Sequence, residues 1–213
     1  MRNQGIHAGP EDQAAPAATT GWRLICLAVL ASAWGLTELI GGETVVLTAV
    51  GLLLLATGRA VLNRLGVSTG MAAVAVVFKS VNTAPFLCHL VGIALLGIAF
   101  DIAATLLWRD GRRAYIRAAL TGGLAAYMSC FLFAVAMIWV FEFRYWAGGG
   151  FARLGEHTLY SGSRGALTGL LLVPVGLWSG RRLLRLAAGH PRLILPTTVV
   201  ACLVIWVVGP FIR

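Results

Sequence analysis

The chain has 213 residues, of which 59% are hydrophobic and only 12% are charged, whereas soluble globular domains carry about 25% charged residues. Disorder, collagen and a disulfide-rich secreted scaffold are excluded, because apolar residues dominate, the 26 glycines have no three-residue period and there are only 4 cysteines. The net charge of +9 comes mainly from arginines in predicted loops, with no basic run interleaved with aromatic residues, so no nucleic-acid partner is expected.

The remaining class is an integral membrane protein. Residues 1–20 are polar and rich in Ala, Pro, Gly and Thr, which is typical of a flexible cytoplasmic tail. Residues 21–213 form a single transmembrane helical domain of seven apolar segments, and a spanning helix needs about 20 residues. The sequence therefore predicts an all-α, polytopic helical membrane protein with six to seven transmembrane segments. The segments cover residues 22–40, 44–62, 69–84, 85–107, 116–141, 163–183 and 193–211.

The third segment differs from the others. Its apolar run, Met71 to Phe78, is short and is followed by polar residues and then by Pro85. Proline disfavours helix at the residue before it. We therefore expect a broken or re-entrant stretch near residues 79–85, so that segments three and four form either two crossings or one re-entrant hairpin.

The positions of the cations predict the orientation. Most of the 17 Lys and Arg residues, including clusters at 109–117 and 181–192, share one side of the membrane in this scheme. Cytoplasmic loops carry an excess of Lys and Arg. The sequence thus predicts an integral protein of the cell (inner) membrane with a cytoplasmic amino terminus and with the loops at 41–43 and 142–163 outside.

Polar side chains gather at the predicted outer ends of the segments. They are Glu38, Lys79, Asn82, His89, Glu142 and Arg144. Charges at membrane depth cost about 2.5–3.5 kcal/mol each on insertion scales, so they indicate function unless they snorkel or pair. The group predicts an outward-facing substrate pocket, in which Lys79 and Arg144 pair with an anionic group while Glu38, Glu142 and His89 bond to polar groups. The alternative is a layer of interfacial residues at the lipid headgroups.

Lys79 is the only lysine in the chain. An ammonium group at this depth needs a counter-charge, so we expect Glu38, Glu142 or an anionic substrate group within salt-bridge distance. Asp101 lies deeper, toward the cytoplasmic side. We expect it to balance Arg109 and the arginines that follow, or to bond to a neighbouring helix, and the alternative is a proton-linked carboxylate.

The first segment carries a stripe of small residues on one face. Ala28, Ala31, Ser32 and Gly35 occupy positions i, i+3, i+4 and i+7. Small residues let a second helix approach closely. The stripe therefore predicts either packing inside the bundle or a docking face for a partner subunit.

Motifs of catalysis are missing from the sequence. It holds no GxSxG, HExxH, Walker A or GxGxxG pattern, and its few acidic residues do not form the repeated pairs of a di-metal bundle. We expect no enzyme activity, no metal site and no cofactor. In the competing case of a haem or quinone protein, the residues that would serve are Cys88, His89, His157 and His190.

Three stretches carry a family resemblance. They are Ala33-Trp34-Gly35-Leu36-Thr37-Glu38, the break from Lys79 to Pro85, and Gly165-Ala166-Leu167-Thr168-Gly169-Leu170. In these stretches and in size, the chain resembles the membrane substrate-binding subunits (S components) of energy-coupling factor importers for vitamins and metals. The resemblance implies a six-helix bundle that binds a vitamin-sized ligand on its outer side. It also implies docking, through small-residue motifs of the first helices, to a coupling subunit driven by two ATPases. The segment after Pro196 is additional to this plan.

The sequence leaves three functions open. The first is the substrate-binding membrane subunit of a small-solute importer, with a small-molecule substrate, a coupling subunit, ATPases and membrane lipid as partners. The second is a non-catalytic anchor or assembly subunit of a larger membrane complex. The third is a small intramembrane haem or quinone protein.

Overall fold

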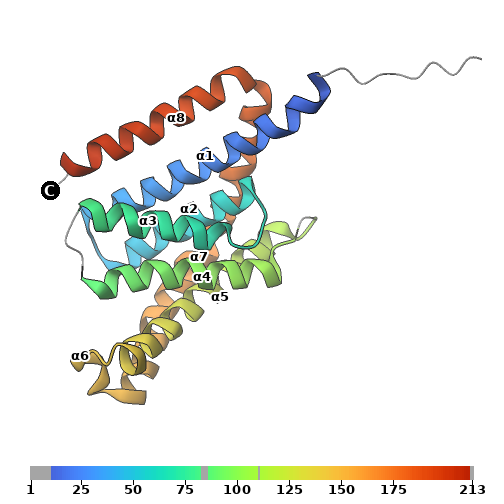
Figure 1. Cartoon of the computed structure of the whole chain (residues 1–213). Coiled ribbons are helices and arrows are strands. Elements are labelled where there is room, and N and C mark those ends of the chain that lie inside the picture. Colours follow the sequence, from blue (N-terminus) through green and yellow to red (C-terminus); the bar gives the residue numbers. More distant parts are fainter. Residues whose placement is uncertain (1–10, 83–85, 110, 212–213) are drawn as a thin grey trace, which may run out of the picture.

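The computed structural model describes residues 11–82, 86–109 and 111–211, and these ranges are almost entirely helical, with no strand among them (Figure 1). A π-helical turn, Ala136–Val140, extends the fifth helix, and a 3-10 turn, Gly209–Phe211, ends the last one. The predicted all-α class is confirmed. The α-helices are α1 (Glu11–Ile40), α2 (Thr44–Val61), α3 (Val67–Asn82), α4 (Leu87–Leu107), α5 (Ala114–Val135), α6 (Arg144–Ala147), α7 (Gly150–Gly189) and α8 (Pro191–Val208).

Helix α1 begins inside the segment predicted to be a flexible tail. Its first residue is Glu11, so residues 11–20 are helical in the structure. The stretch 14–18 holds four alanines, and alanine has the highest helix propensity of all residues. Residues 1–10 of the predicted tail lie outside the described residues.

Five helices in the described chain are long and apolar enough to cross a membrane. They are Thr20–Ile40, Thr44–Val61, Leu87–Leu107, Ala114–Val140 and Leu193–Phe211. Helix α3 is apolar but has only 16 residues, or about 24 Å of helix against a hydrocarbon core of about 30 Å. Helix α7 has 40 residues, but charged side chains interrupt its apolar run. The count of six to seven crossings stays a prediction that depends on α3 and α7.

Helices α3 and α4 form an antiparallel pair on the two sides of the predicted break. Helix α3 ends at Asn82, Phe86 precedes the first turn of α4, and residues 83–85 lie outside the described residues. The start of α3 meets the second half of α4, because a Cβ placed on Gly97 would lie 2.9 Å from the carbonyl oxygen of Ser68. The chain therefore reverses direction between α3 and α4.

Close helix contacts at glycines hold α7 against its neighbours. A Cβ on Gly169 would lie 2.7 Å from the carbonyl group of Gly122 in α5, and a Cβ on Gly176 would lie 2.6 Å from the carbonyl oxygen of Leu53 in α2. Only glycine permits such backbone approach. Helix α7 therefore packs closely against both α2 and α5.

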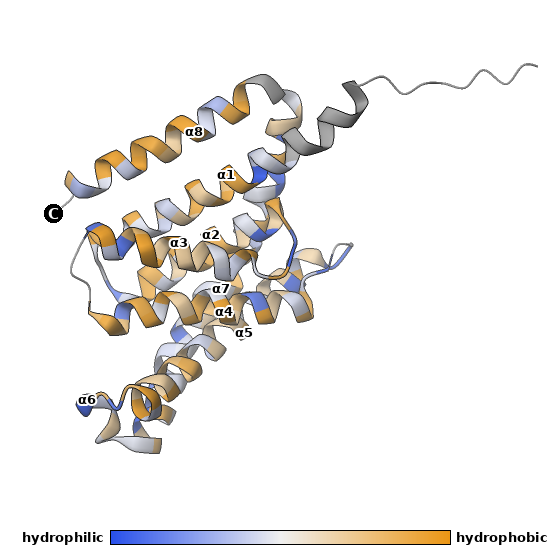
Figure 2. Cartoon of the chain, viewed as in Figure 1, coloured by the Kyte–Doolittle hydropathy of each residue, from blue (hydrophilic) through white to orange (hydrophobic). Residues whose placement is uncertain are grey.

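Helix α8 lies alongside α1 at the edge of the bundle (Figure 1). Figure 2 shows that it is mostly apolar, and its large side chains such as Leu203 and Val207 are exposed. Trp206 is only partly exposed, because its ring packs edge-on against Phe78 of α3, with 5.0 Å between the ring centroids. An exposed apolar face is what a helix at the lipid boundary presents.

Candidate functional site

A cavity of about 360 Å³ lies between α1, α2, α4, α5, α6 and α7. It occupies the end of the bundle where α1 ends and α2 and α4 begin. Its size falls within the range of ligand pockets, about 300–1,000 Å³. The lining residues are Trp34, Glu38, Gly42, Thr44, Val45, Leu47, Thr48, Cys88, His89, Gly92, Ile93, Leu96, Ser129, Cys130, Phe133, Trp146, His157, Ser161 and Gly165.

Glu38 and Lys79 form an ion pair at the edge of this cavity. The Lys79 Nζ lies 2.9 Å from the Glu38 Oε2, and the two side chains are only 6% and 9% exposed. The expectation that Lys79 has a carboxylate within salt-bridge distance is confirmed, and the carboxylate is Glu38. Glu38 lines the cavity, whereas Lys79 is not among the lining residues. Lys79 therefore contacts the lining residue Glu38 without lining the cavity itself.

The other predicted pocket residue of α3, Asn82, faces a different neighbour. Its side chain is buried, its Nδ2 donates a hydrogen bond to the Phe78 carbonyl at 2.7 Å, and its amide group lies against Gly209 at the end of α8. The Asn82 Oδ1 has no hydrogen-bond partner among the described residues. Asn82 is thus adjacent to the ion pair in sequence but does not line the cavity.

Glu142 and Arg144 lie apart from the other predicted residues. Both are exposed, and they border a separate surface hollow next to α6, together with Trp139 and Phe151. Glu142 has a φ of 47°, in the left-handed region, where the chain turns from the π-helical turn into α6. The cavity therefore receives Glu38 and His89 from the predicted set, but not Glu142, Arg144 or Asn82.

Phe133, Trp146 and His157 form an aromatic cluster in the cavity lining, which the sequence did not predict as a group. The ring centroids of Phe133 and Trp146 are 5.3 Å apart, and His157 lies 5.6 Å from the first and 4.9 Å from the second. Ser161 lies one turn after His157, with its Oγ 3.3 Å from the Nδ1. Burial lowers the pKa of His157, which favours the neutral imidazole at pH 7.

Trp34 completes the aromatic lining from α1. Its ring is fully buried, and its Nε1 has no hydrogen-bond partner among the described residues. A signal for this residue was present, because Trp34 lies one turn before Glu38 in the stretch that carries the family resemblance. No sequence pattern indicates that Phe133, Trp146 and His157 meet, since they come from three helices.

Cys88 and Cys130 also line the cavity, next to His89 and Ser129 in the sequence. Both thiols are free. Across the described part of the chain, no three His, Cys, Asp or Glu side chains come close enough together to hold a metal ion. The polar groups of the cavity can therefore accept and donate hydrogen bonds, but they form no ready-made ligand set.

The small-residue stripe of α1 packs inside the chain. Ala31 and Ser32 are fully buried, and the Ser32 Oγ accepts a hydrogen bond of 2.9 Å from the Trp206 Nε1 of α8. A Cβ on Gly35 would lie 2.8 Å from the ring of Phe78 in α3. Ala28 is only partly buried. The face predicted for packing or docking is thus covered by α3 and α8.

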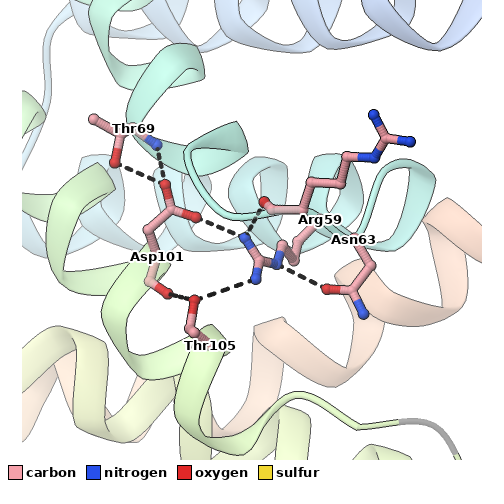
Figure 3. Close-up of polar contacts among 6 residues, drawn as sticks. Arg59, Asn63, Thr69, Asp101 and Thr105 are labelled. Carbon is pink, nitrogen blue, oxygen red and sulfur yellow. Dashed lines mark hydrogen bonds and ion pairs between the residues drawn. The ribbon is translucent and has the colours of Figure 1, made fainter. Parts of the chain in front are cut away.

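A second buried ion pair joins α2 and α4 at the arginine-rich end (Figure 3). The Arg59 Nη1 lies 2.7 Å from the Asp101 Oδ1, and both side chains are 4% exposed. The Asp101 Oδ2 accepts hydrogen bonds from the backbone N and the Oγ1 of Thr69, at 2.8 and 2.7 Å. The carboxylate therefore ties the start of α3 to α2 and α4.

The arginine of this network is also bound on its other sides. Its Nε donates to the Asn63 Oδ1 at 3.0 Å, its Nη2 lies 3.4 Å from the Thr105 Oγ1, and its Nη1 also reaches the Arg64 carbonyl. The expectation that Asp101 bonds to a neighbouring helix is confirmed. Arg59 lies in the last turn of α2, inside the segment predicted at 44–62, and its side chain is buried.

Comparisons of the chain with known protein families, with curated proteins and with solved structures find no match.

Proposed function

We propose that this chain is the substrate-binding membrane subunit of an importer for a small, vitamin- or metal-like solute. The observation that carries the proposal is the cavity of about 360 Å³, which is lined by residues of six helices and combines aromatic walls with a few polar groups. Ligand pockets have this composition, because apolar walls provide binding energy and a few polar groups fix the orientation.

The position of the cavity supports uptake from outside. It lies at the end of the bundle away from Arg59, Arg64 and the arginines at 112–117. In an inner membrane the arginine-rich end is cytoplasmic by the positive-inside rule. The cavity then faces the outside, where an importer meets its solute.

In this proposal the chain performs no chemistry on the solute. The printed sequence holds no Walker A motif, so the energy for import comes from a separate coupling subunit and its ATPases. Docking of such a subunit on Ala28, Ala31, Ser32 and Gly35 requires α8 to move away, because α8 covers part of this stripe.

Filling the cavity tests the proposal directly. Gly92 lines the cavity, and a Cβ there would meet only the Phe133 ring, at 3.9 Å. Gly92→Leu therefore places a side chain into the cavity without a backbone clash. Gly70→Leu is the matched control, because Gly70 is an exposed helical glycine with open space around its Cα and does not line the cavity.

The measurement is mass spectrometry of small molecules released from each purified protein, with a thermal-stability screen against a panel of small solutes as its second arm. We expect wild type and Gly70→Leu to carry or be stabilised by the same solute, and Gly92→Leu to lose it. Equal retention by Gly92→Leu would place binding elsewhere. A folded wild type that neither carries nor responds to any solute would contradict the proposal.

A further inference from the structure

We propose that the cavity selects flat nitrogen-containing solutes that present a cationic or hydrogen-bond-donating group, such as an amidine or an aminoheterocycle, and disfavours carboxylates and phosphates. This inference rests on the proposed solute-binding function and names its substrate class. It replaces the anionic solute that the sequence alone suggested.

The charged residues of the cavity lining indicate which solutes the cavity prefers. Glu38 is the one Asp, Glu, Lys or Arg residue among the described residues that line the cavity. The cations that would receive an anion lie elsewhere, since Lys79 pairs with Glu38 from outside the lining and Arg144 borders a separate hollow. An anionic solute would therefore meet a carboxylate and no lining cation, which is unfavourable at low dielectric.

Glu38 has acceptor capacity left for a ligand. Lys79 occupies its Oε2, and in the described part of the chain no hydrogen bond reaches its Oε1. An ionised carboxylate offers about four lone-pair sites on two oxygens. A ligand N–H group, above all a charged one, is the partner that such an oxygen prefers.

The aromatic residues of the cavity lining indicate that the solute is flat. Trp34, Phe133 and Trp146 present ring systems from α1, α5 and α6, and His157 joins the last two. Planar rings stack on such walls or meet them edge-on, and cations are attracted to aromatic faces. The Trp34 Nε1 itself is turned toward Gly51 of α2, where a Cβ would lie 3.0 Å from it, so Trp34 contributes ring surface to the lining. A flat ring with a donor group suits the aromatic walls and the open oxygen of Glu38 together.

Three nearly isosteric probes test the charge preference: benzamidinium, benzamide and benzoate. They share a benzene ring and a flat head group but carry positive, zero and negative charge. Binding to the detergent-purified full chain is measured by saturation-transfer NMR titration. For wild type we expect benzamidinium to bind about tenfold more tightly than benzamide, with benzoate weakest, as removal of one charge-assisted hydrogen bond implies.

The variant Glu38→Gln should abolish the difference in affinity between the three probes. Glu43→Gln is the matched control, because Glu43 is an exposed glutamate at the start of α2 that does not line the cavity. Glu43→Gln should keep the wild-type order. If Glu38→Gln does not fold because Lys79 stays charged, Glu38→Gln/Lys79→Met removes both charges and should likewise bind benzamidinium and benzamide equally.

The outcomes separate the two proposals. Tighter binding of benzoate than of benzamidinium would overturn the inferred substrate class and leave solute binding intact. A preference for benzamidinium that persists when Glu38 is replaced would overturn the role of Glu38. If none of the probes binds the folded wild type and no solute is released from it, both proposals fail.

Discussion

Glu38 and Asp101 each pair with a cation from another helix, near opposite ends of the bundle. The Glu38 pair lies beside the cavity and joins α1 to α3, and the Asp101 pair joins α2 to α4. A buried pair is costly to desolvate, but removing one partner costs more, because it leaves an uncompensated charge. Each pair therefore fixes which helices are neighbours at its end of the molecule.

Asp101→Asn tests this view at the arginine-rich end. It leaves the guanidinium of Arg59 buried without its carboxylate, so we expect the free energy of unfolding to fall by about 3–5 kcal/mol. Reversible unfolding in mixed micelles, followed by circular dichroism, measures the change. The double variant Arg59→Met/Asp101→Asn removes the orphaned charge and should be less destabilised than the single variant. Wild-type stability of Asp101→Asn would show that the pair is not coupled to folding.

His157 gives the cavity wall a pH dependence. Burial between aromatic rings lowers the pKa of His157, which lies on α7 before the predicted span at 163–183. The unfolded histidine titrates at about pH 6.5, so below this pH the unfolded state binds more protons than the folded state. Stability from His157 is therefore full above about pH 6.5 and falls as the pH drops through the lowered folded pKa.

We expect wild type to lose more stability than His157→Gln when the pH is lowered from about 7.5 to about 5. Thermal unfolding of the purified protein at the two pH values measures the loss. His89→Gln is the control, because His89 is exposed and this variant should show the wild-type loss. An equal loss in wild type and His157→Gln would assign the pH dependence to other groups.

At the scale of elements, the contact between α5 and α7 depends on glycines, because they have no side chain to separate the two helices. A Cβ on Gly169 would lie 2.7 Å from backbone atoms of Gly122, whereas a Cβ on Gly123, the next residue, would meet only Leu170, at 3.6 Å. The first position cannot accept a methyl group unless the helices separate. The second can accept one in ordinary van der Waals contact.

Gly169→Ala should therefore lower the free energy of unfolding by about 1–3 kcal/mol, the usual cost of overpacking. Gly123→Ala should leave it unchanged or raise it slightly, because alanine is a better helix former than glycine. Unfolding in mixed micelles compares the two variants. Equal stability of Gly169→Ala and Gly123→Ala would mean that the helices adjust freely at this contact.

The helices themselves were predictable where hydrophobicity alone decides them. Helix α2 covers residues 44–61 against a prediction of 44–62, and α4 ends at Leu107 as predicted. Helix α7 was predicted only in its apolar middle. Its polar ends are also helical in the structure, and at the first of them His157 packs against Phe133. Such tertiary contacts are not visible in a hydropathy profile.

The depth of each site residue in the membrane was predictable from the sequence, but the neighbour that its side chain faces was not. A charge at membrane depth needs a counter-charge, so the sequence predicted Glu38, Glu142 or a substrate anion beside Lys79, and the structure places Glu38 there. The predicted outer layer also grouped Glu142 and Arg144 with this pair, although these residues lie at another part of the same end. Depth along a helix follows from sequence position, whereas rotation about the bundle axis depends on packing. The Arg59 and Asp101 pair was missed for the same reason, because it depends on how α2 and α4 are rotated toward each other.

At the scale of the whole molecule, the two ends differ in charge. The arginine-rich end holds Arg59, Arg64 and Arg112, and the end with the cavity holds Glu38 and Glu43. The proposed importer role needs the cavity end to face outward. A cavity that faces the cytoplasm would therefore contradict this role. A test of orientation is therefore also a test of function.

Two single cysteines decide the orientation, in a background where all 4 native cysteines are alanine. Glu43→Cys reports on the cavity end and Arg112→Cys on the arginine-rich end, and both positions are exposed. In intact cells we expect a membrane-impermeant maleimide to label Glu43→Cys, and to label Arg112→Cys only after the membrane is permeabilised, as the positive-inside rule requires. The reverse pattern would place the cavity in the cytoplasm, where it cannot receive a solute for import.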